Sequence, residues 1–375
     1  MMNAANKIIS VYTGDVSGVC SALYELDGMS VMHDASGCNS TYNTHDEPRW
    51  YDKPSRVYIS ALTEYDAILG KERTLIDDCV NAARDLKPRF IALAPSPIAC
   101  VMGQDIQAVG KIIEKESGVP VISVETNGMH SYIAGVSEAL VGYAKRFVNS
   151  QLIKKNDNLT INLLGATPLD FGNAENVEDL KNSFEKEGFY VNSVWAMNSS
   201  IEAIDNSASS DVNVVLSSTG LNLAKYFENK FSIPYVVGLP WGEKALKRLS
   251  SMIKTATLGG NLLNYKNSKN GDIAIIGEPV QSASLSYLID KQSQNISLLS
   301  KLTEDDIYAL GEENLEESLK GFSMVIADPL FKPLVSQDCN FIEFPHFAFS
   351  GRIYKEEIIS LADDKGDAWL KRNNL

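Results

Sequence analysis

Basic residues are scarce in this chain. It has 34 lysines and arginines against 48 aspartates and glutamates, which leaves a formal net charge of −14. Nucleic acids and anionic membrane surfaces are bound through an excess of basic side chains on one face. The charge balance therefore argues against nucleic acid and against a membrane as partners. An acidic surface favours solubility and permits a basic protein partner to dock.

Long apolar segments and cysteines are also few. No apolar run in the sequence approaches the ~20 residues of a membrane helix. The first residues lack the basic and apolar regions of a secretion signal. We therefore expect a cytoplasmic protein. In that compartment its five cysteines are expected to be thiols, metal ligands or core residues rather than disulfides.

Phosphate-binding motifs are a third absence. The sequence contains neither a GxxxxGK[ST] loop nor a GxGxxG motif after an apolar run. Glycines that do follow apolar runs, such as Gly165 and Gly277, fit ordinary tight turns. We expect no ATP hydrolysis and no dinucleotide site in this chain.

The pattern that the sequence does contain is a β-branched run, a turn and an amphipathic segment, repeated in order. Residues 56–60 predict a strand and residues 72–86 a helix, and the order restarts at residues 159–164 and 272–276. Strands that alternate with helices predict parallel sheets covered on both faces. We therefore expect an α/β fold of three consecutive Rossmann-like lobes. Their predicted ranges are 1–150, 151–265 and 266–375.

Several short segments resemble nitrogenase component 1 proteins. Residues 33–38 read HDASGC and are similar to the family's H-x-P-x-G-C signature, and Cys20 lies upstream, where the family has its first cluster cysteine. Residues 64–72, 102–106 and 344–351 resemble further family segments in the same order. The family includes protochlorophyllide reductase, chlorophyllide reductase and the reductive cyclase of coenzyme F430 synthesis. The resemblance implies a nitrogenase component 1-like fold.

The resemblance also implies an iron–sulfur cluster, either [4Fe–4S] or a larger P-cluster-like one, held by Cys20, Cys38 and Cys100. Such clusters need several thiolates at one point. All three cysteines lie near expected helix starts or strand ends, and a helix N-terminus lowers the pKa of a thiol. In the family the third cysteine usually lies six residues before the glycine that corresponds to Gly103. This chain has Pro97 at that position. Cys100 is therefore either a shifted ligand or a packing residue.

Three thiolates do not complete a [4Fe–4S] site. The missing ligand has to come from a partner subunit, from a carboxylate such as Asp15 or Asp34, or from a bound small molecule. A two-fold dimer offers a further solution, in which six thiolates surround a larger cluster. Because several of these solutions place the cluster at an interface, we expect a homodimer or a heterodimer with a homologous subunit.

The function implied by the resemblance is that of a nitrogenase-like oxidoreductase subunit. A separate ATP-dependent reductase of the iron-protein type would supply electrons, and the cluster would relay them to a small-molecule substrate in a cleft between lobes. The nitrogen-reducing members hold their large cofactor with a cysteine in the second lobe, and this chain has none there. We therefore do not expect nitrogen fixation. A scaffold for metal-cofactor assembly and a metal-free cleft-type binding protein remain as alternatives.

His346 is the histidine that best suits a cavity between lobes, because Pro345 makes the chain before it rigid. Histidine has a near-neutral pKa and can donate protons during a reduction. A hydrogen-bonded structural histidine is an equally good interpretation. Cys79 lies on the apolar stripe expected for the helix at residues 72–86 and is predicted to be a core residue.

Overall fold

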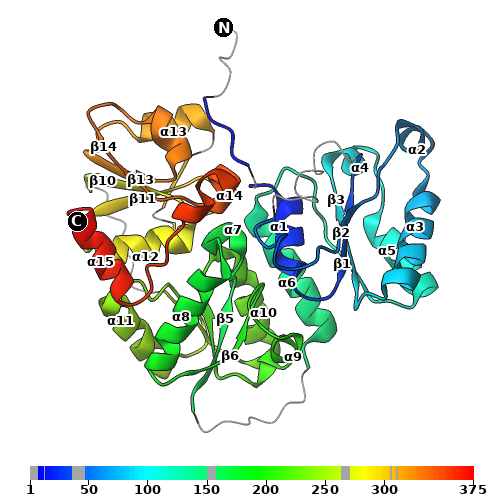
Figure 1. Ribbon diagram of the computed structural model, residues 1–375, viewed down its shortest axis with the longest axis horizontal. Coiled ribbons are helices and arrows are strands. Elements are labelled where there is room, and N and C mark those ends of the chain that lie inside the picture. The colour runs from blue at the N-terminus through cyan, green and yellow to red at the C-terminus, as the bar shows by residue number, and fades with distance from the viewer. Residues whose placement is uncertain are drawn as a thin grey trace. The chain divides into compact units, whose positions relative to one another are not determined.

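A computed structural model gives the fold and describes residues 7–11, 13–35, 47–149, 158–262, 271–304, 306–309 and 311–375 (Figure 1). The chain divides into two compact units, Thr13–Asn149 and Met1–Tyr12 with Ser150–Leu375. Within the described residues the first unit contains one parallel sheet and the second contains two. These sheets with their flanking helices confirm the predicted α/β fold class.

The first unit is built on a four-stranded sheet with the order β2-β1-β3-β4. Helices cover both faces, with α1 and α6 on one side and α3 and α5 on the other (Figure 1). The strands are β1 (Met29–His33), β2 (Val57–Ile59), β3 (Ile91–Pro95) and β4 (Val121–Ser123). The helices are α1 (Asp15–Leu23), α2 (Glu64–Leu69), α3 (Glu72–Leu86), α4 (Pro97–Val101), α5 (Ile106–Ser117) and α6 (Tyr132–Phe147).

Two glycines let α1 and α6 pack closely. A Cβ atom on Gly18 would lie 2.4 Å from the carbonyl oxygen of Tyr132, and one on Gly135 would lie 2.0 Å from that of Asp15. Real Cβ atoms do not approach backbone atoms so closely, so larger residues at these positions would separate the helices. The close packing places the first turn of α1 against the segment before α6.

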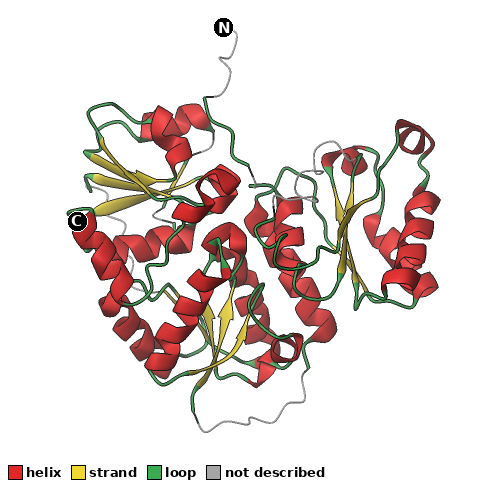
Figure 2. Cartoon of the chain, viewed as in Figure 1, coloured by secondary structure: helices red, strands yellow, loops and turns green. Residues whose placement is uncertain are grey.

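The second unit contains two five-stranded parallel sheets, with the orders β6-β5-β7-β8-β9 and β12-β11-β10-β13-β14 (Figure 2). The first is formed by β5 (Thr160–Leu164), β6 (Tyr190–Val194), β7 (Val212–Val215), β8 (Tyr235–Val237) and β9 (Asn261–Leu262). The second is formed by β10 (Ile273–Ile276), β11 (Ser293–Ser297), β12 (Ile307–Tyr308), β13 (Met324–Ala327) and β14 (Asn340–Glu343).

The two sheets of the second unit share one hydrophobic core. It joins Leu163 of the first sheet to Ile275 of the second through side chains such as Leu246 and Trp369. Helix α12 carries apolar and small side chains on all of its faces, as is typical of a helix that is buried along its length. The helices are α7 (Pro168–Phe171), α8 (Ala174–Lys186), α9 (Ile201–Asp205), α10 (Leu221–Phe231), α11 (Gly242–Lys254), α12 (Pro279–Ile289), α13 (Glu312–Ser318), α14 (Phe347–Ser350) and α15 (Asp364–Arg372).

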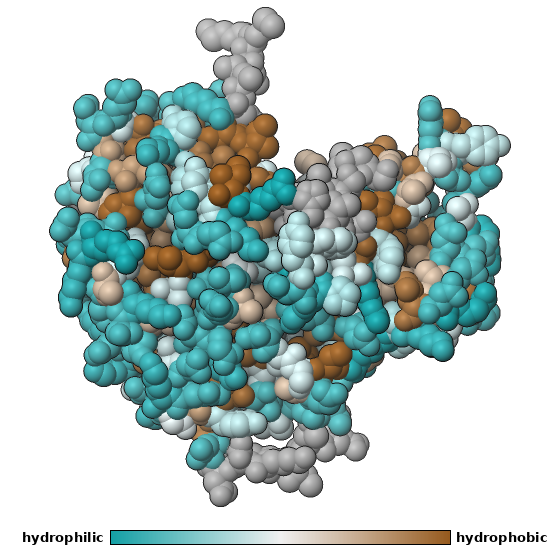
Figure 3. Space-filling model, viewed as in Figure 1, coloured by the Kyte–Doolittle hydropathy of each residue, from teal (hydrophilic) through white to brown (hydrophobic). Residues whose placement is uncertain are grey.

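The surface that Figure 3 shows is mainly polar. Figure 3 shows mainly hydrophilic side chains on the visible face, with apolar side chains in smaller groups. In the part of the chain that the structure describes, none of the helices has the length and apolar character needed to cross a bilayer.

Candidate functional site

Cys100 lies on the short helix α4, directly after strand β3. Its side chain is exposed, and the thiol donates a hydrogen bond to the carbonyl oxygen of Thr126 at 3.2 Å. Partial burial, and secondly the negative charge of Asp15, raise the pKa of the Cys100 thiol. Desolvation and the nearby carboxylate therefore both favour the protonated thiol of Cys100.

A cavity of about 330 Å³ opens beside Cys100. Its walls come from the carboxyl ends of β3 and β4 and from the start of α5, and they include Gln104, Glu125 and His130. The carboxyl ends of parallel strands meet at one edge of the sheet, where α/β lobes commonly bind ligands. The accessible thiol of Cys100 therefore lies beside a cavity at the carboxyl edge of the sheet, where α/β folds commonly bind ligands.

Asp15 fixes the segment that forms the far wall of this cavity. Its side chain is buried at the start of α1. One carboxylate oxygen accepts the backbone N–H of Gly128 at 2.9 Å, and the other accepts that of Asn127 at 2.9 Å. The Nδ1 atom of His130 lies 3.6 Å from the second oxygen. These bonds make Asp15 a structural anchor, and it would have to give up some of them to bind a metal.

His33 ties the end of β1 to the same region. Its Nε2 lies 2.5 Å from Oε1 of Gln104, and its Nδ1 lies 2.8 Å from the hydroxyl of Ser60. Burial lowers the pKa of His33, which favours the neutral ring. His33 therefore links the end of β1 to Gln104 in the cavity wall and to Ser60 after β2.

Cys20 lies in a different environment from Cys100. The sequence predicted a position near a helix start, but Cys20 is in the middle of α1 and its side chain has no exposed surface. Burial, and secondly Glu47, raise the pKa of its thiol far above the ordinary value. The physical reason for the error is that Gly14 ends the extended segment and α1 already begins at Asp15. Cys38 lies outside the described residues.

The described residues do not by themselves fit a complete cluster site. Among them, no group of three or more histidine, cysteine, aspartate and glutamate side chains is arranged to hold a metal ion. Cys100 offers an accessible thiol, whereas the thiol of Cys20 is covered and held in its protonated form. Because a [4Fe–4S] cluster takes four ligands, a cluster at this site would need ligands from beyond the described residues.

A second group of titratable residues lies inside the second unit. Asp170 is on α7 after β5, Glu278 is the N-cap of α12 after β10, and His346 follows β14. All three are buried, and α7 packs on α14, the helix that His346 precedes. His346 Nε2 lies 3.4 Å from Oδ1 of Asp170. The carboxyl ends of strands from both sheets therefore deliver these side chains to one place.

Hydrogen bonds hold the carboxylate of Glu278 and the backbone of Asp170 in position. The two oxygens of Glu278 accept the backbone N–H groups of Ser218 at 2.8 Å and Gln281 at 2.9 Å. The side-chain amide of Gln281 donates to the backbone carbonyl of Asp170 at 2.8 Å. Burial, and secondly the charge of Asp170, raise the pKa of Glu278 to about 7. Glu278 therefore changes its protonation state near neutral pH.

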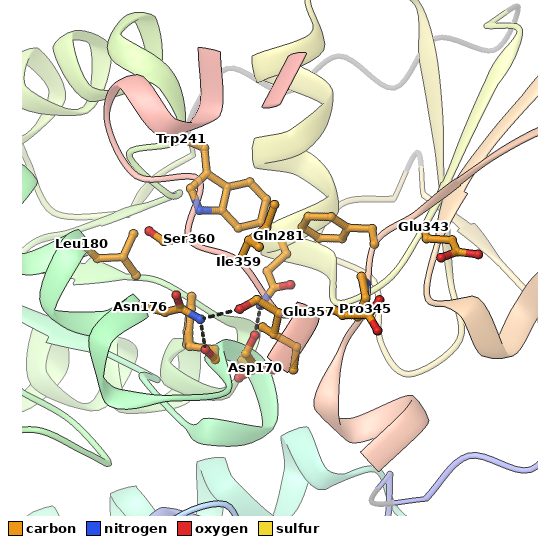
Figure 4. A pocket seen from close by; sticks show the side chains of 13 residues that line it. Asp170, Asn176, Leu180, Trp241, Gln281, Glu343, Pro345, Glu357, Ile359 and Ser360 are labelled. Carbon is orange, nitrogen blue, oxygen red and sulfur yellow. Dashed lines mark hydrogen bonds between the residues drawn. The ribbon is translucent and has the colours of Figure 1, made fainter. Parts of the chain in front are cut away.

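A small cavity of about 50 Å³ adjoins this group. Figure 4 shows Gln281 pointing toward Asp170, with the indole ring of Trp241 beside them. The described residues of the lining include Asp170 and Pro345 but not His346 itself. The prediction that His346 lines a cavity between lobes is thus modified, because His346 lies behind Asp170, which forms part of the wall.

Sequence reasoning missed Asp170 and Glu278. Each follows a strand that the sequence predicts, and each lies close to a proline at the start of a helix, Pro168 and Pro279. That local signal is weak on its own, because the segment around Glu278 also fits an ordinary turn. A carboxylate at the end of a predicted parallel strand is the feature that points to this site.

Comparisons with known proteins agree with the resemblance. The profile of the family described as "Nitrogenase component 1 type Oxidoreductase" matches residues 16–270. One light-independent protochlorophyllide reductase chain, from Porphyra purpurea, is 25% identical over 63% of this chain and 48% of its own length. The nitrogenase iron-molybdenum cofactor biosynthesis protein NifE of Clostridium pasteurianum is 28% identical over 65% of this chain and 52% of its own length.

The chain spans about half the length of these curated relatives. A solved structure, "Nitrogenase Cp1 at pH 5", matches all of this chain and 89% of that chain with a TM-score of 0.69 and 14% identity. At that identity the likeness shows the fold. The sequence profile covers more than half of the residues, and so the chain belongs to the family of nitrogenase component 1 type oxidoreductases.

Proposed function

We propose that this protein is a nitrogenase-like oxidoreductase subunit that binds an iron–sulfur cluster at an interface with a second subunit. In this proposal an ATP-dependent reductase of the iron-protein type supplies electrons, and a small molecule is the substrate. The observation that carries the proposal is the accessible thiol of Cys100 beside a cavity at the carboxyl edge of the first sheet. Membership of a family of oxidoreductases supports the redox role.

The surroundings of Cys100 support an interface at this position. Ile98 and Val101 flank it on α4, with 41% and 89% of their surfaces exposed, and Met129 beside His130 is 83% exposed. Single exposed apolar residues are ordinary on a protein surface. Three of them close to one thiol favour a surface that a partner covers.

The burial of Cys20 changes the proposed ligand set. We assign Cys38 and Cys100 as ligands, because the covered thiol of Cys20 would require α1 to open before it reached a cluster. Two cysteines from each of two identical subunits give the four thiolates of a [4Fe–4S] cluster. A two-fold homodimer therefore satisfies the cluster with two cysteines from each subunit instead of three. A heterodimer with a homologous subunit would satisfy it in the same way.

Anaerobic purification tests this proposal. The parent protein should contain iron and acid-labile sulfide at one cluster per dimer and show an iron–sulfur signal in electron spin resonance. Cys100→Ser and Cys38→Ser should each remove most of the iron. Cys20→Ser and Cys79→Ser, at buried positions, serve as controls and should keep it. A parent protein without iron, or a Cys100→Ser variant with the parent's iron content, would contradict the assignment.

Assembly of a metal cofactor is the second candidate function. The similarity to a protein named for iron-molybdenum cofactor biosynthesis favours it. The two functions differ in what happens to the bound group. A scaffold releases its metal cluster to an acceptor protein, whereas a reductase keeps its cluster through many turnovers. Iron content measured before and after incubation with electron donor and acceptor proteins separates the two.

A further inference from the structure

The small cavity of about 50 Å³ in the second unit has the walls of a binding site. Helices α8 and α12 supply part of the lining, and residues 343–345 and 357–360 supply another part (Figure 4). A single water needs roughly 10–15 Å³ on this measure, so the volume corresponds to about three to five waters. The cavity therefore has room for a small molecule or for the end group of a larger one.

The side-chain amide of Gln281 presents a hydrogen-bond acceptor in this cavity. Its nitrogen donates to the backbone carbonyl oxygen of Asp170 at 2.8 Å, and this bond fixes which end of the amide is the donor. Gln281 is only 4% exposed, and within the described part of the chain its side-chain oxygen accepts no hydrogen bond. Figure 4 shows the amide nitrogen turned toward Asp170 and the oxygen turned away from it, among the other lining side chains. An acceptor without a donor is costly in a buried residue, so this position favours a ligand that brings an N–H group.

Asn176 adds a second acceptor to the lining. Its Nδ2 atom donates to the backbone carbonyl oxygens of Phe171 at 2.8 Å and Ile358 at 3.1 Å. Both hydrogens of the amide are therefore used, and the described residues provide no donor for its oxygen. Two amide oxygens whose orientation is fixed in this way select a ligand with more than one donor.

Two carboxylates make the surroundings of the cavity negative. Glu343 and Glu357 both belong to the lining, and both are exposed. Glu343 forms an ion pair with Lys332 at 3.1 Å, whereas Glu357 has no hydrogen bond or ion pair among the residues that the structure describes. The described lining contains no lysine, arginine or histidine. The cavity wall therefore favours a positively charged ligand.

Aromatic and apolar side chains form the rest of the wall. The rings of Trp241 and Phe344 lie with their centroids 5.8 Å apart and their planes at 72°, and Leu180 lines the same cavity. Cations are attracted to the faces of such rings. A guanidinium group suits this mixed wall better than an ammonium group, because it is planar, is more weakly hydrated and carries donors that point in several directions.

We propose that this cavity binds the guanidinium end of a small molecule. The side-chain oxygen of Gln281 accepts a hydrogen bond from one N–H group, and the carboxylate of Glu357 balances the positive charge from the exposed side. The rings of Trp241 and Phe344 contact the planar face of the group. This binding site does not depend on the proposed iron–sulfur function, because all of these residues belong to the second unit.

Binding of methylguanidinium to the full chain tests the proposal, with methylurea as the matched neutral control. The two molecules have the same planar shape, but methylurea is uncharged and has a carbonyl oxygen in place of one nitrogen. Isothermal titration calorimetry should give a dissociation constant in the millimolar range for methylguanidinium, as is expected for so small a ligand. Methylurea should bind at least about tenfold more weakly, because it lacks the charge and offers an acceptor to an acceptor. Equal binding of the two molecules, or no binding of methylguanidinium, would overturn the proposal.

Two substitutions locate the site. Gln281→Leu should weaken the binding of methylguanidinium by about tenfold, because a hydrogen bond to a charged group is lost. Since Gln281 also holds the backbone of Asp170, Glu357→Gln is a second variant at an exposed position, and it should weaken binding by about two- to fivefold.

Glu356→Gln is the matched control for Glu357→Gln. It removes the same charge from the adjacent exposed residue, which is not among the described lining residues, and it should bind methylguanidinium as the parent does. Equal affinities of Glu357→Gln and Glu356→Gln would show that only the acidic surface attracts the cation, and this result would also overturn the proposal.

Discussion

Replacing Glu278 by glutamine should change how the stability of the second unit depends on pH. In the folded protein, burial and then Asp170 raise the pKa of this carboxyl from 4.5 to about 7. Between these two pH values the folded chain holds a proton that the unfolded chain has released. Stability falls with rising pH wherever the folded state binds more protons. The free energy of unfolding therefore decreases as the pH rises through this window.

The size of the decrease follows from the two pKa values. Their difference is about 2.5 pH units, which corresponds to about 3 kcal/mol at 1.36 kcal/mol per unit. The glutamine variant has no such proton to lose. Its free energy of unfolding is instead lower by about 1–3 kcal/mol at every pH. The reason is that the amide NH2 group, a hydrogen-bond donor, faces the backbone N–H of Ser218 or Gln281, which is also a donor. The free energy of unfolding of the parent minus that of the variant should therefore decrease by about 3 kcal/mol across the window, which removes or reverses the advantage that the parent has at low pH.

Denaturant unfolding at a series of pH values measures this gap. Tryptophan fluorescence is a suitable signal, because Trp195, Trp241 and Trp369 are buried in the second unit. Glu202→Gln is the matched control and should follow the parent at every pH. A difference between parent and Glu278→Gln that stays constant from pH 4.5 to above 7 would refute the reasoning, since the proton on Glu278 would then contribute nothing to stability.

Three other substitutions test the first unit. Gly135→Ala should destabilise the first unit by about 1–3 kcal/mol in thermal unfolding, because the new Cβ would lie 2.0 Å from the carbonyl oxygen of Asp15. Gly14→Ala is the control, since a Cβ at that position meets nothing within 4 Å. Equal melting temperatures for the two variants would contradict the packing argument. Asp15→Asn should shift the pH profile of Cys100 alkylation by iodoacetamide to lower pH, because the negative charge that raises the thiol pKa is removed; an unchanged profile would rule out that influence. Cys20→Ser should react with iodoacetamide as the parent does under native conditions, because the thiol it removes is covered; a loss of labelling would show that Cys20 is accessible.

Much of the fold is present in local sequence patterns. The helix predicted at residues 72–86 is found as α3 (Glu72–Leu86) because Leu75, Ile76, Cys79, Val80 and Ala83 form one buried stripe. The strands predicted at residues 159–164 and 272–276 are likewise found, within one residue, as β5 and β10, since each is a short run of apolar and β-branched residues. Periodicity that is complete within one segment needs no information from the rest of the chain.

Other elements escape prediction because their pattern is weak or admits another meaning. Strand β1 (Met29–His33) ends at the first residue of the segment that resembles the family's cysteine signature, and β11 (Ser293–Ser297) carries several polar residues. Helix α1 is not predicted over its full range, so the sequence places Cys20 at a helix start rather than within the helix. The burial of Cys20 depends on the close packing of α1 on α6, which no local sequence pattern describes.

The sequence alone determined the class of fold, the family and the acidic surface, because composition, periodicity and short motifs are properties of neighbouring residues. Only the tertiary structure decided which side chains act together. Asp170, Glu278 and His346 are far apart in the chain and meet because parallel strands of two sheets end at the same place. The protonation of Glu278 depends on that meeting, since desolvation and a neighbouring charge exist only after the two sheets have packed.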